Sequence, residues 1–276
     1  MKKISYNIEI NAAAKKVWQV LWFMDTYKKW TSVFAEDCTY IGNWQEGTTI
    51  QFVNAAGNGI YAIIQKNIPH LQMTIQHQGE LKDGVQKPSE WAGAIEQYNL
   101  TEQNGITTLQ VSMDTTEEME AYFTETFPKA LVLIKQIAEQ PIPITVHTLL
   151  HTSIEKAWLY FTTPTHITQW NFAADSWQCP TATNNLAVGG NFVYRMEAKD
   201  GSFGFNFSGT YTSMHLHEHI TILLDDGRTV SVSFLNHATG CKLVQVFDAE
   251  DENDLALQQG GWQAILNNYK KYTETN

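Results

Sequence analysis

The amino-acid sequence predicts an α+β protein with two tandem domains, each a curved antiparallel sheet wrapped around a long C-terminal helix. Three observations support this fold class: the chain length, a long internal repeat, and the same order of strand and helix patterns in both halves. The length of 276 residues favours two domains, because a domain typically takes about 150 residues. The hydrophobic content of 43% is high enough for each domain to bury a core.

The internal repeat relates the start of one half to the start of the other. Residues 4–30 align with residues 144–170 without a gap, at a constant offset of 140 residues. A repeat with so long a period indicates a duplicated domain. Four identical pairs mark the alignment: Ile4 and Ile144, Lys16 and Lys156, Trp18 and Trp158, and Trp30 and Trp170.

The boundary between the halves is expected at residues 139–143. Pro141 and Pro143 lie there, and a proline disfavours helix in the residue before it and favours an extended segment. We therefore expect a first domain over residues 1–139 and a second domain over residues 140–276.

Each half begins with a strand and continues with two short helices. Residues 3–10 and 142–150 alternate as half-buried strands do, and helical spacing follows from Ala12 and from Ser153. A further short helix leads to Trp170 in the second half. Several strands then follow, separated by turn-forming residues. The turns fall at residues 56–57, 68–69, 82–84 and 104–105 in the first half, and at 200–201, 225–227 and 238–240 in the second.

A long amphipathic helix closes each half, over about residues 117–138 and 254–273. Apolar residues recur along one face of each helix, and we expect that face to pack into a strongly bent sheet. The acidic residues 248–254 precede the second helix, and we expect their carboxylates to cap its start. The apolar faces consist of Phe127, Leu131 and Ile134 in the first half, and of Trp262, Leu266 and Tyr269 in the second.

Charge and cysteine content exclude several classes of partner. The chain has 18 basic and 29 acidic residues, a formal net charge of −11, which disfavours nucleic acid and anionic membrane surfaces. Cys38, Cys179 and Cys241 are too scattered for a disulfide framework or a zinc site. There is no signal-peptide pattern after Met1 and no apolar run of about 18 residues, so we expect a cytoplasmic protein without membrane insertion.

The second half carries five short motifs in a fixed order. They are Ala157-Trp158 in the first helix, Trp170 after the second, Val188–Phe192 entering a strand, Asp200-Gly201 in a hairpin, and Gly261-Trp262 before Leu266 in the last helix. In this order and spacing they resemble the START-like or SRPBCC superfamily, and within it the activator of heat-shock-protein-90 ATPase homologue family.

The first half matches these motifs less completely. It shares Val17-Trp18 and Trp30, but it has Gly47 alone in place of a glycine pair and Phe127 in place of Trp262. We therefore expect the first domain to be a diverged START-like domain, and the second to be the closer relative of the family.

The resemblance implies a helix-grip fold with a cavity between the long helix and the concave sheet. Members of the superfamily bind apolar small molecules, carry lipids, cyclise polyketides or regulate a chaperone, and no shared nucleophile or acid defines them. The fold alone does not choose among these functions.

Aromatic residues in the second half indicate where such a cavity would lie. Phe205 and Phe207 share one face of a strand with Phe203, and Phe192 and Tyr194 share one face of the strand before it. We expect a ligand cavity there; the alternative is that the rings fill the core completely. The expected lining is Trp170, Phe192, Tyr194, Phe205, Phe207, Phe234, Trp262 and Leu266.

The sequence offers no defensible catalytic or metal-binding set. His215, His217 and His219 would suit a metal if they lay on one strand, but the repeat aligns His217 with His70 beside Pro69, which favours a hairpin turn. We therefore assign no catalytic residue, no metal ligand and no cofactor, and an enzyme is the less favoured class.

Three functions remain. The first is non-catalytic binding of an apolar or amphipathic small molecule, lipid-like or polycyclic, with a role connected to stress or chaperones. The second is a polyketide cyclase or aromatase-like enzyme in which Tyr194, Asn206 or His237 orients the substrate. The third is a protein-interaction (co-chaperone) module that binds a client protein or a chaperone.

Overall fold

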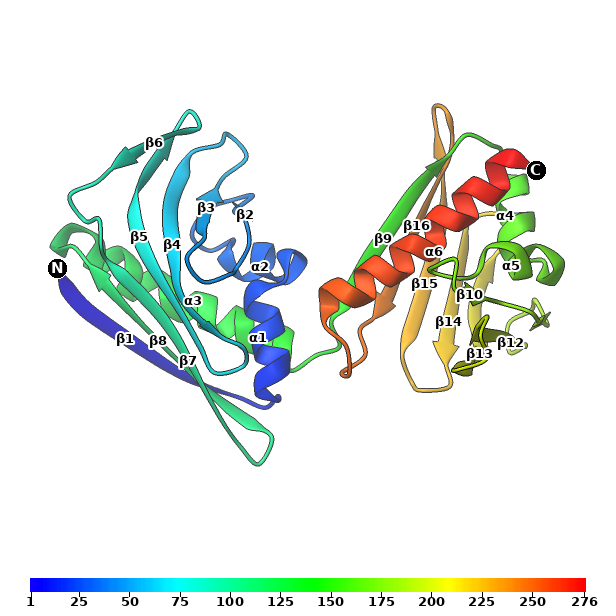
Figure 1. The fold of residues 1–276 in the computed structure, drawn as a ribbon, viewed down its shortest axis with the longest axis horizontal. Coiled ribbons are helices and arrows are strands. Elements are labelled where there is room, and N and C mark those ends of the chain that lie inside the picture. The colour runs from blue at the N-terminus through cyan, green and yellow to red at the C-terminus, as the bar shows by residue number, and fades with distance from the viewer. The chain divides into compact units, whose positions relative to one another are not determined.

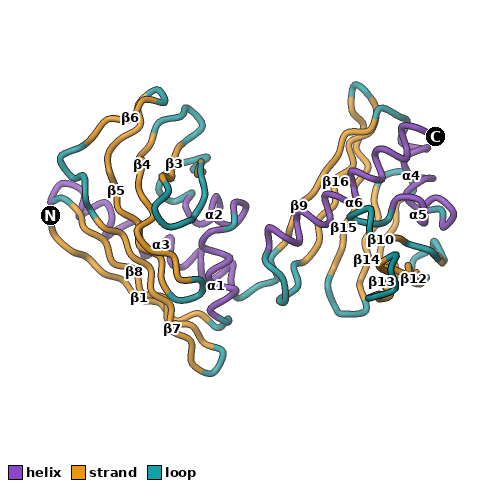
Figure 2. The backbone as a smooth tube through the Cα atoms, viewed as in Figure 1, coloured by secondary structure: helices purple, strands orange, loops and turns teal.

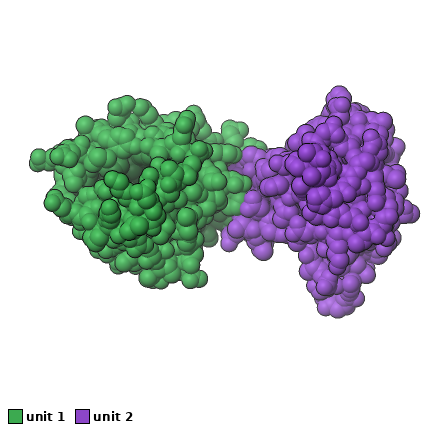
Figure 3. Space-filling view, turned by 90° about the horizontal axis from the view of Figure 1, so that it is seen from above, with its two compact units in different colours: residues 1–141 green, residues 142–276 purple.

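The computed structural model describes all 276 residues and divides into two compact units, Met1–Pro141 and Ile142–Asn276 (Figures 1 and 3). The division lies within residues 139–143, where the two prolines occur. Each unit has an antiparallel sheet, two short helices and one long C-terminal helix, which is the predicted α+β arrangement. No helix of the chain combines the length and the apolar character that crossing a bilayer requires.

The first unit contains eight strands and three helices. In chain order they are β1 (Lys2–Ile10), α1 (Ala14–Trp22), α2 (Met24–Thr31), β2 (Thr39–Ile41), β3 (Thr49–Val53), β4 (Gly59–Ile68), β5 (Gln72–Lys82), β6 (Val85–Pro88), β7 (Ile95–Gln103), β8 (Ile106–Thr115) and α3 (Glu117–Ala138). The strands form one sheet in the order β1-β8-β7-β5-β4-β3-β2, with β6 paired to the end of β5. Helix α3 packs against β1 and against the two short helices.

The second unit repeats this plan. Its elements are β9 (Pro143–Leu150), α4 (Ile154–Thr162), α5 (Pro164–Trp170), β10 (Trp177–Gln178), β11 (Ala182–Asn184), β12 (Asn191–Ala198), β13 (Gly204–His215), β14 (His219–Leu224), β15 (Thr229–His237), β16 (Gly240–Asp248) and α6 (Leu255–Thr275). The sheet order is β10-β12-β13-β14-β15-β16-β9, with β11 paired to β12. Helix α6 packs against β9, α4 and α5 (Figure 1).

Short turns connect the strands at the predicted positions (Figure 2). Asp83-Gly84 joins β5 to β6 and Asn104-Gly105 joins β7 to β8, and all four residues have φ angles between 51° and 77°. Two consecutive positive φ angles are typical of the type I′ turn, whose twist matches that of antiparallel strands. Aspartate, asparagine and glycine adopt such angles readily, so these pairs fix the hairpin register.

Two histidine turns repeat between the units and confirm the hairpin interpretation. His70 lies between β4 and β5 with a φ of 65°, and His217 lies between β13 and β14 with a φ of 63°. Each imidazole packs edge-on against the tryptophan of the first helix of its unit. The ring centroids of Trp18 and His70 are 6.4 Å apart, and those of Trp158 and His217 are 5.8 Å apart. The repeat therefore extends from the first helix into the middle of the sheet.

The two long helices begin and end close to their predicted bounds. The predicted apolar face of α3 is fully buried, and in α6 Leu266 and Tyr269 are buried while Trp262 is partly exposed. The core of each unit lies between its long helix and its sheet. An amphipathic helix buries its apolar face in this way when it packs on a sheet.

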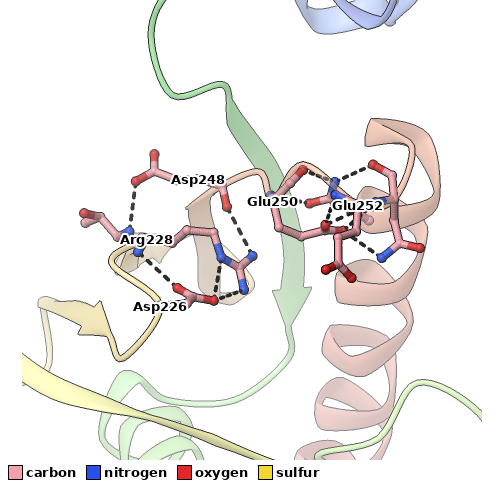
Figure 4. Close-up of polar contacts among 8 residues, drawn as sticks. Asp226, Arg228, Asp248, Glu250 and Glu252 are labelled. Carbon is pink, nitrogen blue, oxygen red and sulfur yellow. Dashed lines mark hydrogen bonds and ion pairs between the residues drawn. The ribbon is translucent and has the colours of Figure 1, made fainter. Parts of the chain in front are cut away.

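The acidic segment before α6 does not cap that helix as expected. Asp254 is the N-cap residue, but its side chain makes no capping hydrogen bond. The carboxylate of Glu250 instead accepts hydrogen bonds from the backbone N–H groups of Glu252 and Asn253 (Figure 4). The carboxylate of Asp248, at the end of β16, accepts a backbone N–H of β15 at 2.9 Å. Glu250 therefore orders the loop before α6, whereas Asp248 links the end of β16 to the start of β15.

Candidate functional site

The first unit holds a cavity of about 530 Å³ between α2, α3 and the concave face of its sheet. Small-molecule sites are typically cavities of about 300–1,000 Å³, mainly apolar and with a few polar groups. This cavity has that size and character. Ten aromatic side chains line it: Trp22, Tyr27, Trp30, Phe34, Phe52, Trp91, Tyr98, Tyr122, Phe123 and Phe127.

Three polar side chains form a hydrogen-bonded chain in the cavity wall. The Tyr98 hydroxyl donates to Oε1 of Glu96 over 2.5 Å, and Nε2 of His77 lies 2.9 Å from Oε2 of the same carboxylate. The side chains of His77 and Glu96 are only 12% and 15% exposed, so the carboxylate is largely removed from water. Both of its oxygens have a partner, which offsets much of the cost of burying a charge.

The sheet register brings these three side chains together. Glu96 and Tyr98 are two residues apart on β7, so both point to the concave face. Glu96 pairs with Ile75 of β5, and His77 is two residues further along that strand, on the diagonal. Diagonal neighbours on one face are within reach of long side chains.

Two tyrosines of the wall stay uncharged near neutral pH. Burial raises the pKa of Tyr98 well above its ordinary value, and the nearby Glu96 carboxylate raises it further. Burial also raises the pKa of Tyr27, with smaller contributions from Cys38 and Glu96. Both rings therefore offer neutral surfaces, and neither adds a charge to the cavity.

The strand registers identify the corresponding residues of the second unit. Ile75 pairs with Glu96 in the first unit, and Ile222 pairs with Val230 in the second, in the alignment that superimposes the two histidine turns. Leu224, Val230 and Val232 are all buried. Counted along the strands, His77, Glu96 and Tyr98 correspond to Leu224, Val230 and Val232, respectively.

The same comparison identifies positions where the first unit has smaller side chains on its sheet than the second unit. Ile50 pairs with Ala62 in the first sheet, and Phe192 pairs with Gly209 at the equivalent position of the second. On this register three isoleucines of the first unit replace three aromatic rings of the second. Isoleucine has a smaller side chain than phenylalanine or tyrosine, and Ile60 of these three lines the cavity, so it leaves space that the larger Phe207 ring would occupy. The pairs are Ile50 and Phe192, Ile60 and Phe207, and Ile64 and Tyr211.

Seven of the eight residues predicted to line a cavity lie on the inner side of the second unit. Phe192 is 4.7 Å from Tyr194 and 5.6 Å from Phe207, between ring centroids. Trp262 of α6 meets this cluster at Phe207, at 5.8 Å. Since these rings contact one another, they occupy part of the space that a ligand would need, and a cavity here stays a prediction. The other three are buried: Trp170, Phe234 and Leu266.

Phe205 does not join these seven, which corrects its place in the predicted lining. It shares their face of the sheet, but it is 44% exposed at the start of β13. Its ring lies 6.2 Å from that of Trp177 and 6.3 Å from that of Phe203. Strand alternation predicts which face a side chain occupies, but not where along the strand the covering layer ends.

The polar residues considered for a cyclase are not brought together. The Tyr194 hydroxyl lies 3.4 Å from the hydroxyl of Tyr211. Asn206 is exposed and alternates with the ring-bearing positions, so it lies on the other face of β13. His237 is exposed and contacts Thr239 in the turn after β15. The second unit therefore has no polar site made from these three groups.

His77, Glu96 and Tyr98 were not predicted from the sequence, although the repeat contained a signal for them. The alignment that pairs His70 with His217 also sets His77 against Leu224. An ionisable residue opposite an aliphatic one, on a strand face that turns inward, indicates a buried polar site. The predicted cavity was instead assigned to the second half, because aromatic residues alternate along its strands.

Both units have the helix-grip architecture, in which a curved antiparallel sheet holds a long C-terminal helix. The family model for the activator of Hsp90 ATPase homolog 1-like protein matches residues 151–274. The solution structure of the AHSA1-like protein from Aeromonas hydrophila is 38% identical and covers 49% of this chain and 93% of that one, with a TM-score of 0.47. The chain belongs to this family of activator of Hsp90 ATPase homolog 1-like proteins, as the motifs of its second half predict.

Two further solved structures are similar. Chr148 from Cytophaga hutchinsonii is 41% identical and covers 49% of this chain and 93% of that one, with a TM-score of 0.43. The di-domain ARO/CYC protein BexL from the BE-7585A biosynthetic pathway is 10% identical and covers 100% of both chains, with a TM-score of 0.42. No curated protein matches the chain.

Proposed function

We propose that the first unit binds an apolar, ring-containing small molecule non-catalytically in its cavity. The observation that carries this proposal is the difference between the two repeats. The first unit has a cavity and a buried polar chain where the second unit has rings, leucine and valine. The second unit adopts the same fold with leucine and valine at these positions, so the fold does not require a cavity or a buried carboxylate there. Both features are expected to lower the stability of the first unit. Departures of that kind are typical of functional sites.

A titration with Nile red, an uncharged dye that fluoresces in apolar surroundings, tests this proposal. We expect saturable binding to the wild-type chain. Ile60→Phe places in the cavity wall the kind of ring that the second repeat has there, and should weaken binding about tenfold or more because it fills the space. Val132→Phe adds the same ring on the exposed face of α3 and is the matched control. If the folded wild type takes up no dye, the proposal is wrong.

Cys38 provides a second readout of the same cavity. It belongs to the lining and is half-buried, whereas Cys179 and Cys241 are buried in the second unit. A bound ligand should therefore slow the alkylation of Cys38 by N-ethylmaleimide. The same ligand should have no effect on alkylation once the chain is unfolded in urea.

A protein-interaction role is the second candidate, and exposed rings on the second unit favour it. The centroids of Trp177, Phe203 and Phe205 lie 6.1 to 6.3 Å apart, and Phe203 is 63% exposed. Exposed apolar patches often mark interaction sites. Because the family is named for activation of the Hsp90 ATPase, the test is ATP hydrolysis by purified Hsp90 with and without this chain. We expect stimulation that Phe203→Ser reduces; no stimulation by the wild type would remove this candidate.

A further inference from the structure

We propose that the ligand of the first unit carries a cationic amine, held between the Glu96 carboxylate and the aromatic rings of the cavity wall. This inference rests on the proposed binding function and adds the chemical class of the ligand. It follows from the charges that line the cavity, from the rings near Glu96, and from the groups that the cavity lacks.

The charged side chains of the wall are acidic. Glu80, Glu96 and Asp114 line the cavity, and no lysine or arginine does, although the N-terminal residue Met1 also belongs to the lining. Asp114 has a structural role, because its carboxylate accepts the backbone N–H of Ile95 at 3.0 Å, as Asp248 accepts the equivalent N–H of β15 in the second unit. Glu96 has no acidic counterpart there, since a valine occupies its position. Its charge is therefore particular to the first unit.

A β-bulge brings Glu80 to the same side of the sheet. His77 and Gly79 pair with adjacent residues of β4, so Gln78 is an extra residue in β5. His77 and Glu80 are three residues apart and both line the cavity, although strict alternation would place them on opposite faces. Glu80 is exposed, whereas Glu96 is deep. The cavity thus offers one carboxylate to the solvent side and one to the interior.

Aromatic rings surround the polar chain. The ring centroid of Trp22 lies 5.0 Å from that of Tyr98, and the centroids of Phe52 and Trp91 lie 6.4 Å and 6.3 Å from that of His77. The face of an aromatic ring attracts a cation, more strongly where water is excluded. Rings beside a buried carboxylate are a combination that favours an ammonium group.

An anionic ligand is disfavoured at the same place. Its charge would meet the Glu96 carboxylate in an environment of low dielectric constant, with no lysine or arginine to compensate. Tyr27 and Tyr98 donate hydrogen bonds but bring no positive charge. His77 is the one basic side chain of the wall, and its Nε2 already faces Glu96. A fatty acid or another carboxylate therefore fits this cavity poorly.

A series of three anthracene probes of nearly equal size tests the inference by fluorescence titration of the full chain. The probes are 9-anthracenemethylamine, 9-anthracenemethanol and 9-anthracenecarboxylate, which are cationic, neutral and anionic near neutral pH. We expect the amine to bind about tenfold more tightly than the alcohol, and the carboxylate to bind most weakly.

Matched glutamine variants locate the source of this preference. Glu96→Gln keeps the size of the side chain and removes its charge, so the amine should lose most of its advantage over the alcohol. Glu9→Gln removes one charge from the outer face of β1 and should change nothing. If circular dichroism shows that Glu96→Gln does not fold, Glu80→Gln takes its place, with a smaller expected loss because Glu80 is exposed.

The outcomes separate this inference from the function on which it rests. Equal binding of all three probes to the wild type, or an amine preference unchanged in every folded carboxylate variant, would overturn the amine inference and leave small-molecule binding intact. Binding of the carboxylate in preference to the amine would also overturn it. If none of the probes and no Nile red binds, both proposals are wrong.

Discussion

At the scale of single residues, the Glu96 carboxylate depends on its two hydrogen-bond partners. Tyr98 and His77 each contact one of its oxygens, and the side chain is only 15% exposed. A buried charge that loses a partner keeps its desolvation cost and has less to offset it. The second unit avoids this problem because Val230 occupies the equivalent position. We therefore expect the stability of the first unit to fall strongly when a side chain of the His77, Glu96 and Tyr98 cluster is substituted.

Removing one hydroxyl group measures that dependence. Tyr98→Phe deletes the donor to Oε1 of Glu96 and should lower the free energy of unfolding by about 1–3 kcal/mol. Tyr122→Phe is the control, because its hydroxyl donates to the carbonyl of Phe34 at a 40% exposed position where water can replace it. It should cost about 0.5 kcal/mol or less. Equal losses in urea unfolding of the two variants would show that Glu96 does not rely on Tyr98.

The thiol of Cys179 should be unreactive in the folded chain. Burial raises its pKa to about 11, so about one thiol in a thousand is ionised near pH 8. Because the pKa is raised, alkylation should stay slow at neutral pH and increase only as the pH approaches that value. Mass spectrometry after iodoacetamide treatment checks this. Cys38, which is half-buried, should be modified first. Rapid modification of folded Cys179 near pH 8 would contradict the expected pKa.

At the scale of elements, the sequence predicts local structure well because its signals are local. The helix expected over residues 117–138 is α3, and turns lie at the predicted positions Asp83-Gly84 and Asn104-Gly105. The cavity of the first unit was not predicted from the sequence, because a cavity depends on the combined volumes of side chains on several neighbouring strands. Strand alternation places Ile60 on the inner face of the first sheet and Phe207 on the inner face of the second, so it does not distinguish a small side chain from a large one. Only the three-dimensional register shows that several isoleucines replace rings at once.

Pro128 lies inside α3 and should weaken that helix. It has no N–H to donate to the carbonyl of Thr124, and proline is about 3 kcal/mol less favourable than alanine in a helix interior. Part of this is offset because proline also restricts the unfolded chain. Pro128→Ala should therefore raise the free energy of unfolding by about 2 kcal/mol in urea titrations. Lys129→Ala, at an exposed neighbour, should change it by about 0.5 kcal/mol or less.

The opposite result for Pro128→Ala would have a specific meaning. A loss of stability would show that the backbone conformation imposed by the proline is needed to position the neighbouring Phe127, which is buried and lines the cavity. The Nile red titration would then be expected to weaken as well.

At the scale of the whole molecule, the chain contains two versions of one fold that have diverged in their interiors. The second unit carries the family motifs and an interior with many ring contacts, and the first unit carries the cavity and the polar chain. One copy of a duplicated domain can acquire a costly polar site while the other keeps aliphatic residues at the same positions. Each unit has its own sheet and long helix, so each contains what a domain needs to fold alone.

This leads to the last prediction, that the units are separable. Limited proteolysis should cut near residues 138–144, and fragments 1–141 and 142–276 should each unfold cooperatively in urea. Because the whole cavity wall belongs to the first unit, fragment 1–141 should bind Nile red with the affinity of the full chain. Fragment 142–276 is the internal control and should lack this site. An unfolded fragment 1–141 would contradict the prediction, and a folded fragment that does not bind the dye would show that the site needs residues outside the first unit.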